Sequence, residues 1–274
     1  MKGDNLTREE PRDATLERLR SSSTVMMSPD LFERLYLQPM NHVKGDLRKT
    51  FGNPTPLGLL GFVLGLTPLA CSFIGWRGAG GLGAANIGVF YFIGGPCLII
   101  SGVLEFFLGN SFPFAVFTTY GCVFLALASS LHPFYNSAGA YDPDGNFAKG
   151  LQTPEFNATF AYFPISIACM NLFFLVCATK VNIVFMLVFA GSGLGFTLLS
   201  GALWALAEGA ADSGAKLLVG AGSAWFFTAI MGWYLLLSQL LGVMGFDIQL
   251  PTSSHANATI PRVLELTLRR DKAI

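Results

Sequence analysis

The residues with the clearest chemical potential open the first long apolar stretch of the chain, in the run Asn53-Pro54-Thr55-Pro56-Leu57-Gly58-Leu59. Proline is tolerated in the first turn of a helix, because its missing N–H would have no partner there. The Asn53 side chain can accept hydrogen bonds from the free N–H groups of that turn. The positive end of a helix dipole at membrane depth attracts a carboxylate. The run therefore predicts a helix start that meets an anionic solute at Asn53 and Pro54, or a helix start with no further role.

A second candidate is Glu105, an acidic residue near the end of the second apolar stretch, followed by Gly109 and Asn110. A carboxylate at this depth is costly unless it has a partner or meets water, so it indicates a functional site. Glu105 could shape a solute site or exchange a proton. The alternative is a structural acid at a helix end that reaches interfacial water or bonds the turn at Asn110.

A third candidate is Tyr120, in the segment Phe117-Thr118-Thr119-Tyr120-Gly121 of the third apolar stretch. Its ring offers an aromatic wall and its hydroxyl a hydrogen-bond donor. Such a group can gate a narrow pore or orient a small anion. A tyrosine at this depth could equally anchor the protein at the membrane interface.

Other kinds of site find no support in the residues. The chain has no phosphate-binding loop, no cluster of metal ligands and no nucleophile beside a base, so we expect no enzymatic activity, metal or cofactor. The five cysteines lie in apolar stretches without metal spacing, and the three histidines are scattered outside those stretches. The net charge is zero. Nucleic acid is therefore not expected as a partner.

The elements that must position these residues are membrane-spanning helices. Of the 274 residues, 52% are hydrophobic and 12% are charged. A soluble domain usually carries about twice that charged fraction. Crossing the hydrocarbon takes about 20 apolar residues in a helix, which satisfies its own backbone groups. The long uncharged stretches predict an all-α membrane protein with six transmembrane helices, at 56–76, 86–108, 112–131, 158–178, 183–206 and 217–241.

Glycines and connections refine this arrangement. Gly58, Gly61 and Gly65 share one face of the first span, and Gly191 and Gly195 lie four residues apart in the fifth. Small residues with this spacing permit close helix contact. We expect a tight turn at residues 109–113 and an ordered surface loop or short flap at 132–157.

The distribution of cations predicts the orientation in the membrane. Of the 17 lysines and arginines, nine lie in the first 50 residues and four in the last 29. Cytoplasmic segments carry such an excess, and an even number of spans puts both ends on one side. We therefore expect a cytoplasmic, largely disordered tail at 1–50, a transmembrane domain at 51–245 and a cytoplasmic tail at 246–274.

The run at Asn53 resembles the NPAPLGL signature of the acetate uptake transporter family of the YaaH/SatP type, with Thr55 in place of the usual alanine. A second block is similar in order and spacing: Gly88-Val89-Phe90-Tyr91, Gly102-Val103-Leu104-Glu105, Gly109-Asn110-Ser111-Phe112 and Phe117-Thr118-Thr119-Tyr120-Gly121. The resemblance covers about residues 50–245, and the long N-terminal segment is similar to that of the fungal acetate permeases.

This resemblance implies a six-helix protomer in a ring-shaped homo-hexamer, with a solute path through each protomer and proton coupling. It implies a hydrophobic constriction that includes Phe62 and Tyr120. A leucine of the family constriction aligns near residues 191–194, where this chain has Gly-Ser-Gly-Leu. A wider path at that point could admit larger monocarboxylates or dicarboxylates. The motif residues Pro56, Leu57, Gly58, Gly109 and Asn110 would have structural roles.

Three functions follow as hypotheses. The first is transport of acetate and similar small monocarboxylates across the plasma membrane, either coupled to protons or channel-like. The second is a membrane sensor of acetate or related acids without substantial flux. The third is conduction of ammonium or small neutral solutes. Flux through protein in liposomes, and swelling with neutral solutes, would distinguish them.

Overall fold

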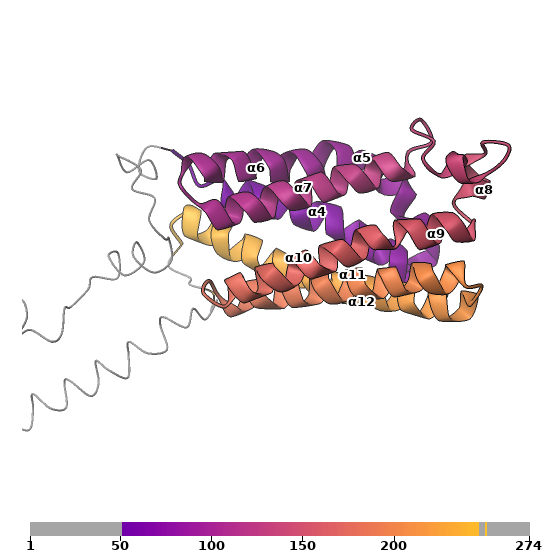
Figure 1. Ribbon diagram of the computed structural model, residues 1–274. Helices are drawn as coiled ribbons and strands as arrows, with labels where there is room; N and C mark the ends of the chain where they lie inside the picture. Colours follow the sequence, from indigo (N-terminus) through magenta and orange to yellow (C-terminus); the bar gives the residue numbers. More distant parts are fainter. Residues whose placement is uncertain (1–50, 247–249, 251–274) are drawn as a thin grey trace, which may run out of the picture. The chain divides into compact units, whose positions relative to one another are not determined.

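The computed structural model describes residues 51–246 and 250, and every regular element among them is helical (Figure 1). Six of its helical stretches are long and apolar enough to cross a membrane: Thr55–Ile74, Gly81–Phe107, Ser111–Leu131, Pro154–Ala178, Ile183–Ala207 and Ala211–Val243. The predicted all-α fold with six spans is therefore confirmed. The predicted tails lie outside the described residues, apart from residues 246 and 250.

The first span is α4 (Thr55–Ile74), which has proline in its first turn and ends at Gly75 in the left-handed region. The predicted face of small residues on α4 is the face that packs against the neighbouring helix. A Cβ atom at Gly58 would lie 2.7 Å from Ser101 Oγ, and one at Gly61 would lie 2.7 Å from Cys97 Cβ. The glycines thus allow α4 to approach the helix that carries Ser101 and Cys97.

The second span differs from the single helix predicted at 86–108. It consists of η2 (Gly81–Asn86), α5 (Ile87–Val89), the π-helical η3 (Phe90–Gly94) and α6 (Gly95–Phe107). The Gly95 N–H donates to the Phe90 carbonyl, five residues back, and Pro96 has no N–H to continue a regular ladder. The wide turn is a local response to that proline.

The third span, α7 (Ser111–Leu131), begins within the turn that was predicted at 109–113, so the turn itself is shorter. Gly109 turns the chain with a φ of 80°. The connection after α7 covers residues 132–153 and holds η4 (Ala138–Tyr141) and α8 (Phe147–Gly150). The fourth span starts earlier than predicted, because α9 (Pro154–Phe160) leads into α10 (Tyr162–Ala178).

The last two spans are α11 (Ile183–Ala207) and α12 (Ala211–Val243). The start of α12 was predicted six residues too late, at 217, because Asp212 and Lys216 bound the uncharged stretch while the helix continues through them. Gly191 and Gly195 face α12, where added Cβ atoms would meet Thr228 and Trp225.

The helices associate in two groups that share the contact between α4 and α12. In the first, α4 and α7 pack against α6. In the second, α11 packs between α10 and α12. The start of α4 and the end of α12 lie at one end of the bundle, and α8 lies at the other (Figure 1). The core residues come from both groups, so a central region between α4, α7, α10, α11 and α12 is lined by side chains rather than by closely packed backbones.

Candidate functional site

Three cavities follow one another along this central region. The first is an open mouth at the start of α4, the second an inner cavity one to two turns further along α4, and the third an outer cavity beyond it. For the inner and outer cavities the same order holds on α7, α11 and α12, whereas the mouth is lined by residues before and at the start of α4 and by the turn between α6 and α7. Cavities in a single series between helices are the arrangement expected of a solute path.

The mouth has a volume of about 300 Å³ and contains the polar side chains of Asn53, Thr55 and Asn110. Phe51 and Leu108 supply its apolar part. The Asn53 amide donates to Gln239 Oε1 at 3.3 Å, which joins the start of α4 to the end of α12. The structure thus brings Asn53, which was predicted for the solute path, and Asn110, which was predicted to have a structural role, to one opening.

The helix start behind the mouth has its backbone donors engaged. Asn53 Oδ1 accepts from the Thr55 N–H at 3.0 Å, although the N-cap residue of α4 is Pro54 rather than the asparagine that the sequence suggested. The N–H groups of Leu57 and Gly58 point to the Pro54 carbonyl, which also accepts from Ser101 Oγ at 2.8 Å. A carboxylate at this end would therefore meet side-chain amides and the helix dipole rather than a free backbone N–H.

Glu105 lies behind the mouth and is fully buried. Thr55 Oγ1 donates to its Oε1 at 2.5 Å, and Asn110 Nδ2 donates to its Oε2. Thr55 and Asn110 stand at the mouth, whereas Glu105 is not among the residues that line it. Of the two readings of this acid, the geometry supports the structural one, in which Glu105 bonds the turn at Asn110 and ties it to α4.

The inner cavity is small and apolar. Its volume is about 20 Å³, little more than the roughly 10–15 Å³ that one water needs. Leu59, Leu98, Phe117, Phe189 and Leu235 are among its walls. A solute larger than water can occupy this space only if side chains move.

Phe62 and Tyr120 separate the inner cavity from the outer one, since both residues line both cavities. Their rings meet edge to face with centroids 6.1 Å apart. Both side chains are buried, so the path is closed at this pair. The two residues that the family resemblance brought together are thus in direct contact, and their part in transport stays a prediction.

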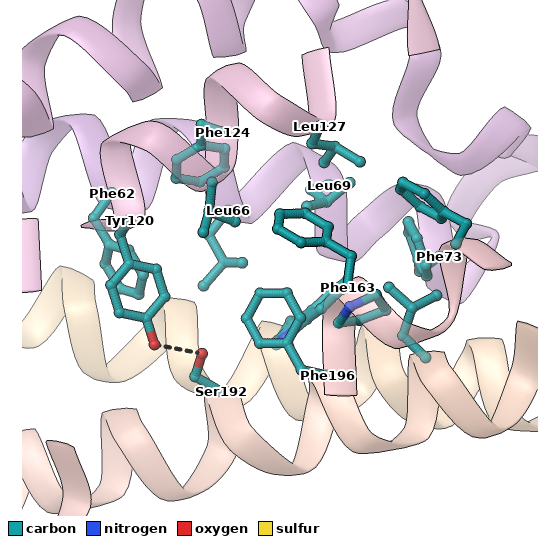
Figure 2. Close-up of a pocket in the computed structure, with 15 residues that line it drawn as sticks. Phe62, Leu66, Leu69, Phe73, Tyr120, Phe124, Leu127, Phe163, Ser192 and Phe196 are labelled. Carbon is teal, nitrogen blue, oxygen red and sulfur yellow. Dashed lines mark hydrogen bonds between the residues drawn. The ribbon is translucent and has the colours of Figure 1, made fainter. Parts of the chain in front are cut away.

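Two residues at the constriction were missed in the sequence. Tyr120 Oη donates to Asn171 Oδ1 at 2.6 Å. The same hydroxyl lies 3.0 Å from Ser192 Oγ (Figure 2). Ser192 belongs to the Gly-Ser-Gly-Leu segment that aligned with a constriction leucine. Leu194 of that segment is 55% exposed and does not line the path. The available signal was a polar side chain inside each of two spans, at Asn171 and Ser192.

The outer cavity, of about 50 Å³, is walled by aromatic rings (Figure 2). Phe73, Phe124, Phe163, Phe196 and Trp225 contribute to it. Its lining residues include no charged side chain. An ion would lose its hydration here without compensation, whereas a neutral small molecule would not.

Comparison with known proteins identifies a family and several relatives of this chain. Residues 36–253 match the model of the GPR1/FUN34/yaaH family. Protein alcS of Aspergillus fumigatus is 41% identical over 84% of this chain and 85% of its own length. The acetate transporter protein patA of Aspergillus clavatus is 30% identical over 67% of this chain and 70% of its own.

A solved structure, that of the bacterial acetate channel SatP, has a similar fold, with a TM-score of 0.56 at 24% identity. The similarity covers 74% of this chain and 99% of the channel chain. Six spans, the ordered motifs and the matched family model agree, and the chain therefore belongs to the GPR1/FUN34/yaaH family, as a multi-pass membrane protein.

Proposed function

We propose that this protein conducts acetate and similar small monocarboxylates across a membrane, as a channel or a proton-coupled transporter. The observation that carries the proposal is the series of cavities from a polar mouth to two apolar chambers, closed by the Phe62–Tyr120 pair. The names of patA and of the SatP channel support acetate as the solute. The name alcS states no solute, so the experiment below includes a panel of acids.

The walls determine which form of the acid crosses. Transfer of an isolated carboxylate from water into an apolar space has a large free-energy cost. For a neutral carboxylic acid, the cost is limited to the hydrogen bonds that its polar groups lose. The polar mouth, which contains the Asn53 amide, can admit the hydrated anion before it takes up a proton. The acid then passes Phe62 and Tyr120 in neutral form, which moves one proton with each acetate.

We also infer a plasma-membrane location, cytoplasmic ends and a ring-shaped homo-hexamer. Six spans put both ends on one side, and 13 of the 17 lysines and arginines lie in the two end segments. That bias favours the cytoplasmic side. The hexamer is supported by the family resemblance and by the apolar side chains that the protomer leaves exposed on α6 and α10, such as Phe106 and Phe173.

The test is uptake of labelled acetate, propionate and succinate into liposomes that contain the purified protein. Phe62→Trp enlarges one ring of the constriction and should reduce acetate uptake about tenfold or more. Leu60→Trp is the matched control, because Leu60 lies two residues away on the exposed side of α4 and lines none of the three cavities. Its uptake should equal that of the unmodified protein.

The outcomes separate the candidate functions. Uptake that Phe62→Trp leaves intact would contradict the assigned path, and saturable acetate binding without uptake would favour a sensor. The apolar chambers also favour passage of small neutral solutes as a second candidate. Liposome swelling with ammonia or glycerol, but no acetate uptake, would establish that function instead.

A further inference from the structure

We propose that Asn171 and Ser192 are positioning residues that fix the Tyr120 side chain across the path, so that opening depends on displacement of Phe62. This inference rests on the proposed function and deepens it. It makes the two rings of the constriction unequal: one is held by hydrogen bonds, and the other by packing alone.

The first support is where Tyr120 lies. Its backbone belongs to α7, which packs against α6, while α10 and α11 pack against each other in the second group of helices. The Tyr120 hydroxyl nevertheless reaches Asn171 on α10 and Ser192 on α11. The ring therefore spans the central region from one group of helices to the other, with an attachment at each end (Figure 2).

The second support is the pattern of donors and acceptors. A tyrosine hydroxyl has one proton, which goes to Asn171 Oδ1 at 2.6 Å, so the Ser192 hydroxyl donates in the 3.0 Å contact. The Asn171 amide donates to the Ile167 carbonyl at 2.9 Å, which turns Oδ1 toward Tyr120. Each of these donors thus has an acceptor, and the network defines one position for the ring.

The third support is burial. Asn171 is 1% exposed and Ser192 is 2% exposed, so these hydrogen bonds are shielded from bulk solvent. A buried donor or acceptor without a partner carries its full desolvation penalty.

Phe62 has no polar atom and is retained by packing alone. Its ring lies beside Gly232 of α12, where an added Cβ would be 3.0 Å from the ring. Glycine leaves the space there free of a side chain. Moving Phe62 therefore breaks no hydrogen bond, while moving Tyr120 breaks two.

A fixed Tyr120 sets the largest solute that displacement of Phe62 can admit. Once Tyr120 is released, both rings can move and a bulkier acid can pass. The informative quantity is the ratio of isobutyrate uptake to acetate uptake, because this ratio does not depend on how much folded protein the liposomes contain.

The experiment measures this ratio for Tyr120→Phe and Ser192→Ala. The control is Ser200→Ala, a buried serine two turns further along α11 whose hydroxyl bonds only the Ala161 and Phe196 carbonyls among the described contacts. We expect the ratio to rise about three- to tenfold in the first two variants, the factor that one lost buried hydrogen bond represents. Ser200→Ala should leave it unchanged. An unchanged ratio in Tyr120→Phe and Ser192→Ala, with acetate uptake intact, would overturn the inference.

A second measurement does not need transport. Thermal unfolding in detergent should show that Tyr120→Phe and Ser192→Ala are non-additive, whereas Tyr120→Phe and Ser200→Ala are additive. Additivity in both pairs would overturn the inference even if some variants transport poorly. Absence of acetate uptake by the unmodified protein would instead refute the proposed function, and the unfolding cycle would still test whether Tyr120 is fixed.

Discussion

The burial and hydrogen bonds of Glu105 favour a structural role over proton exchange for this carboxylate. Both of its oxygens accept hydrogen bonds, from Thr55 and Asn110, and the side chain has no exposed surface. A group that exchanges protons with a passing solute must reach the path, and Glu105 is separated from the mouth by its own two partners. The threonine that replaces the usual alanine of the motif supplies one of these bonds.

This arrangement predicts the behaviour of Glu105→Gln. A glutamine has one carbonyl oxygen to offer two donors, so one buried hydrogen bond is lost and stability should fall by about 1–3 kcal/mol. Acetate uptake per folded protein should stay within about twofold, with the same pH profile. Thermal unfolding and uptake measure the two effects, and Glu208→Gln at the exposed end of α11 is the control. Loss of uptake or a flattened pH profile would show that Glu105 exchanges protons.

At the scale of single residues, the sequence predicted some residues of the candidate site and missed others. Phe62 and Tyr120 came from the family resemblance, and the structure places their rings in contact. Asn171 and Ser192 could not be selected, because polar side chains inside spans also serve as helix-packing contacts and their direction depends on helix rotation. Ser200 illustrates this ambiguity, since it is as buried as Ser192 but bonds only carbonyl groups in the described contacts.

At the scale of the elements, uncharged stretches located all six spans but misplaced some boundaries. A charge ends a hydrophobic stretch without ending the helix, as at the start of α12, because backbone hydrogen bonds do not require apolar side chains. The π-helical turn before Pro96 depends on how the backbone hydrogen bonds rearrange around a residue that has no N–H. Hydropathy carries no information about that rearrangement. The glycine face of α4 was predictable, because three- and four-residue spacing fixes a shared face.

The contact between α4 and α12 provides a prediction at this scale. In Gly232→Ala, the new Cβ would lie 2.8 Å from Val63 Cγ1 and 3.0 Å from the Phe62 ring, so Phe62 would lose the space behind it. We expect acetate uptake to fall about tenfold, with a stability cost of about 1–3 kcal/mol from overpacking.

Gly242→Ala is the control for that prediction, because it lies on the same helix and its Cβ would meet nothing within 4 Å. It should leave uptake unchanged, and helix propensity should if anything favour it. Equal uptake by the two variants would contradict the idea that Phe62 needs the space beside α12.

For the whole molecule, the proposed path predicts the protonation form in which a solute crosses. The mouth offers amides, and beyond it the lining residues of both chambers include no charged side chain. Transfer of a charge through such a section costs far more than transfer of a neutral acid. Under the proposed function, a solute would therefore cross this section in protonated form, since Tyr120 is the one titratable side chain among the residues that line the two chambers.

This selection predicts the pH dependence of uptake. A carboxylic acid with a pKa near 4 to 4.5 loses its neutral form about tenfold per pH unit above that value, so acetate uptake at fixed total concentration should fall about tenfold per unit between roughly pH 6 and 8. Acetamide, a neutral molecule of similar shape, should enter at the same rate throughout. Uptake by liposomes without protein measures diffusion through the lipid and is subtracted, since neutral acids also cross bilayers. A flat acetate profile after this correction would mean that the anion itself crosses, and that the chambers acquire polar groups when Phe62 moves.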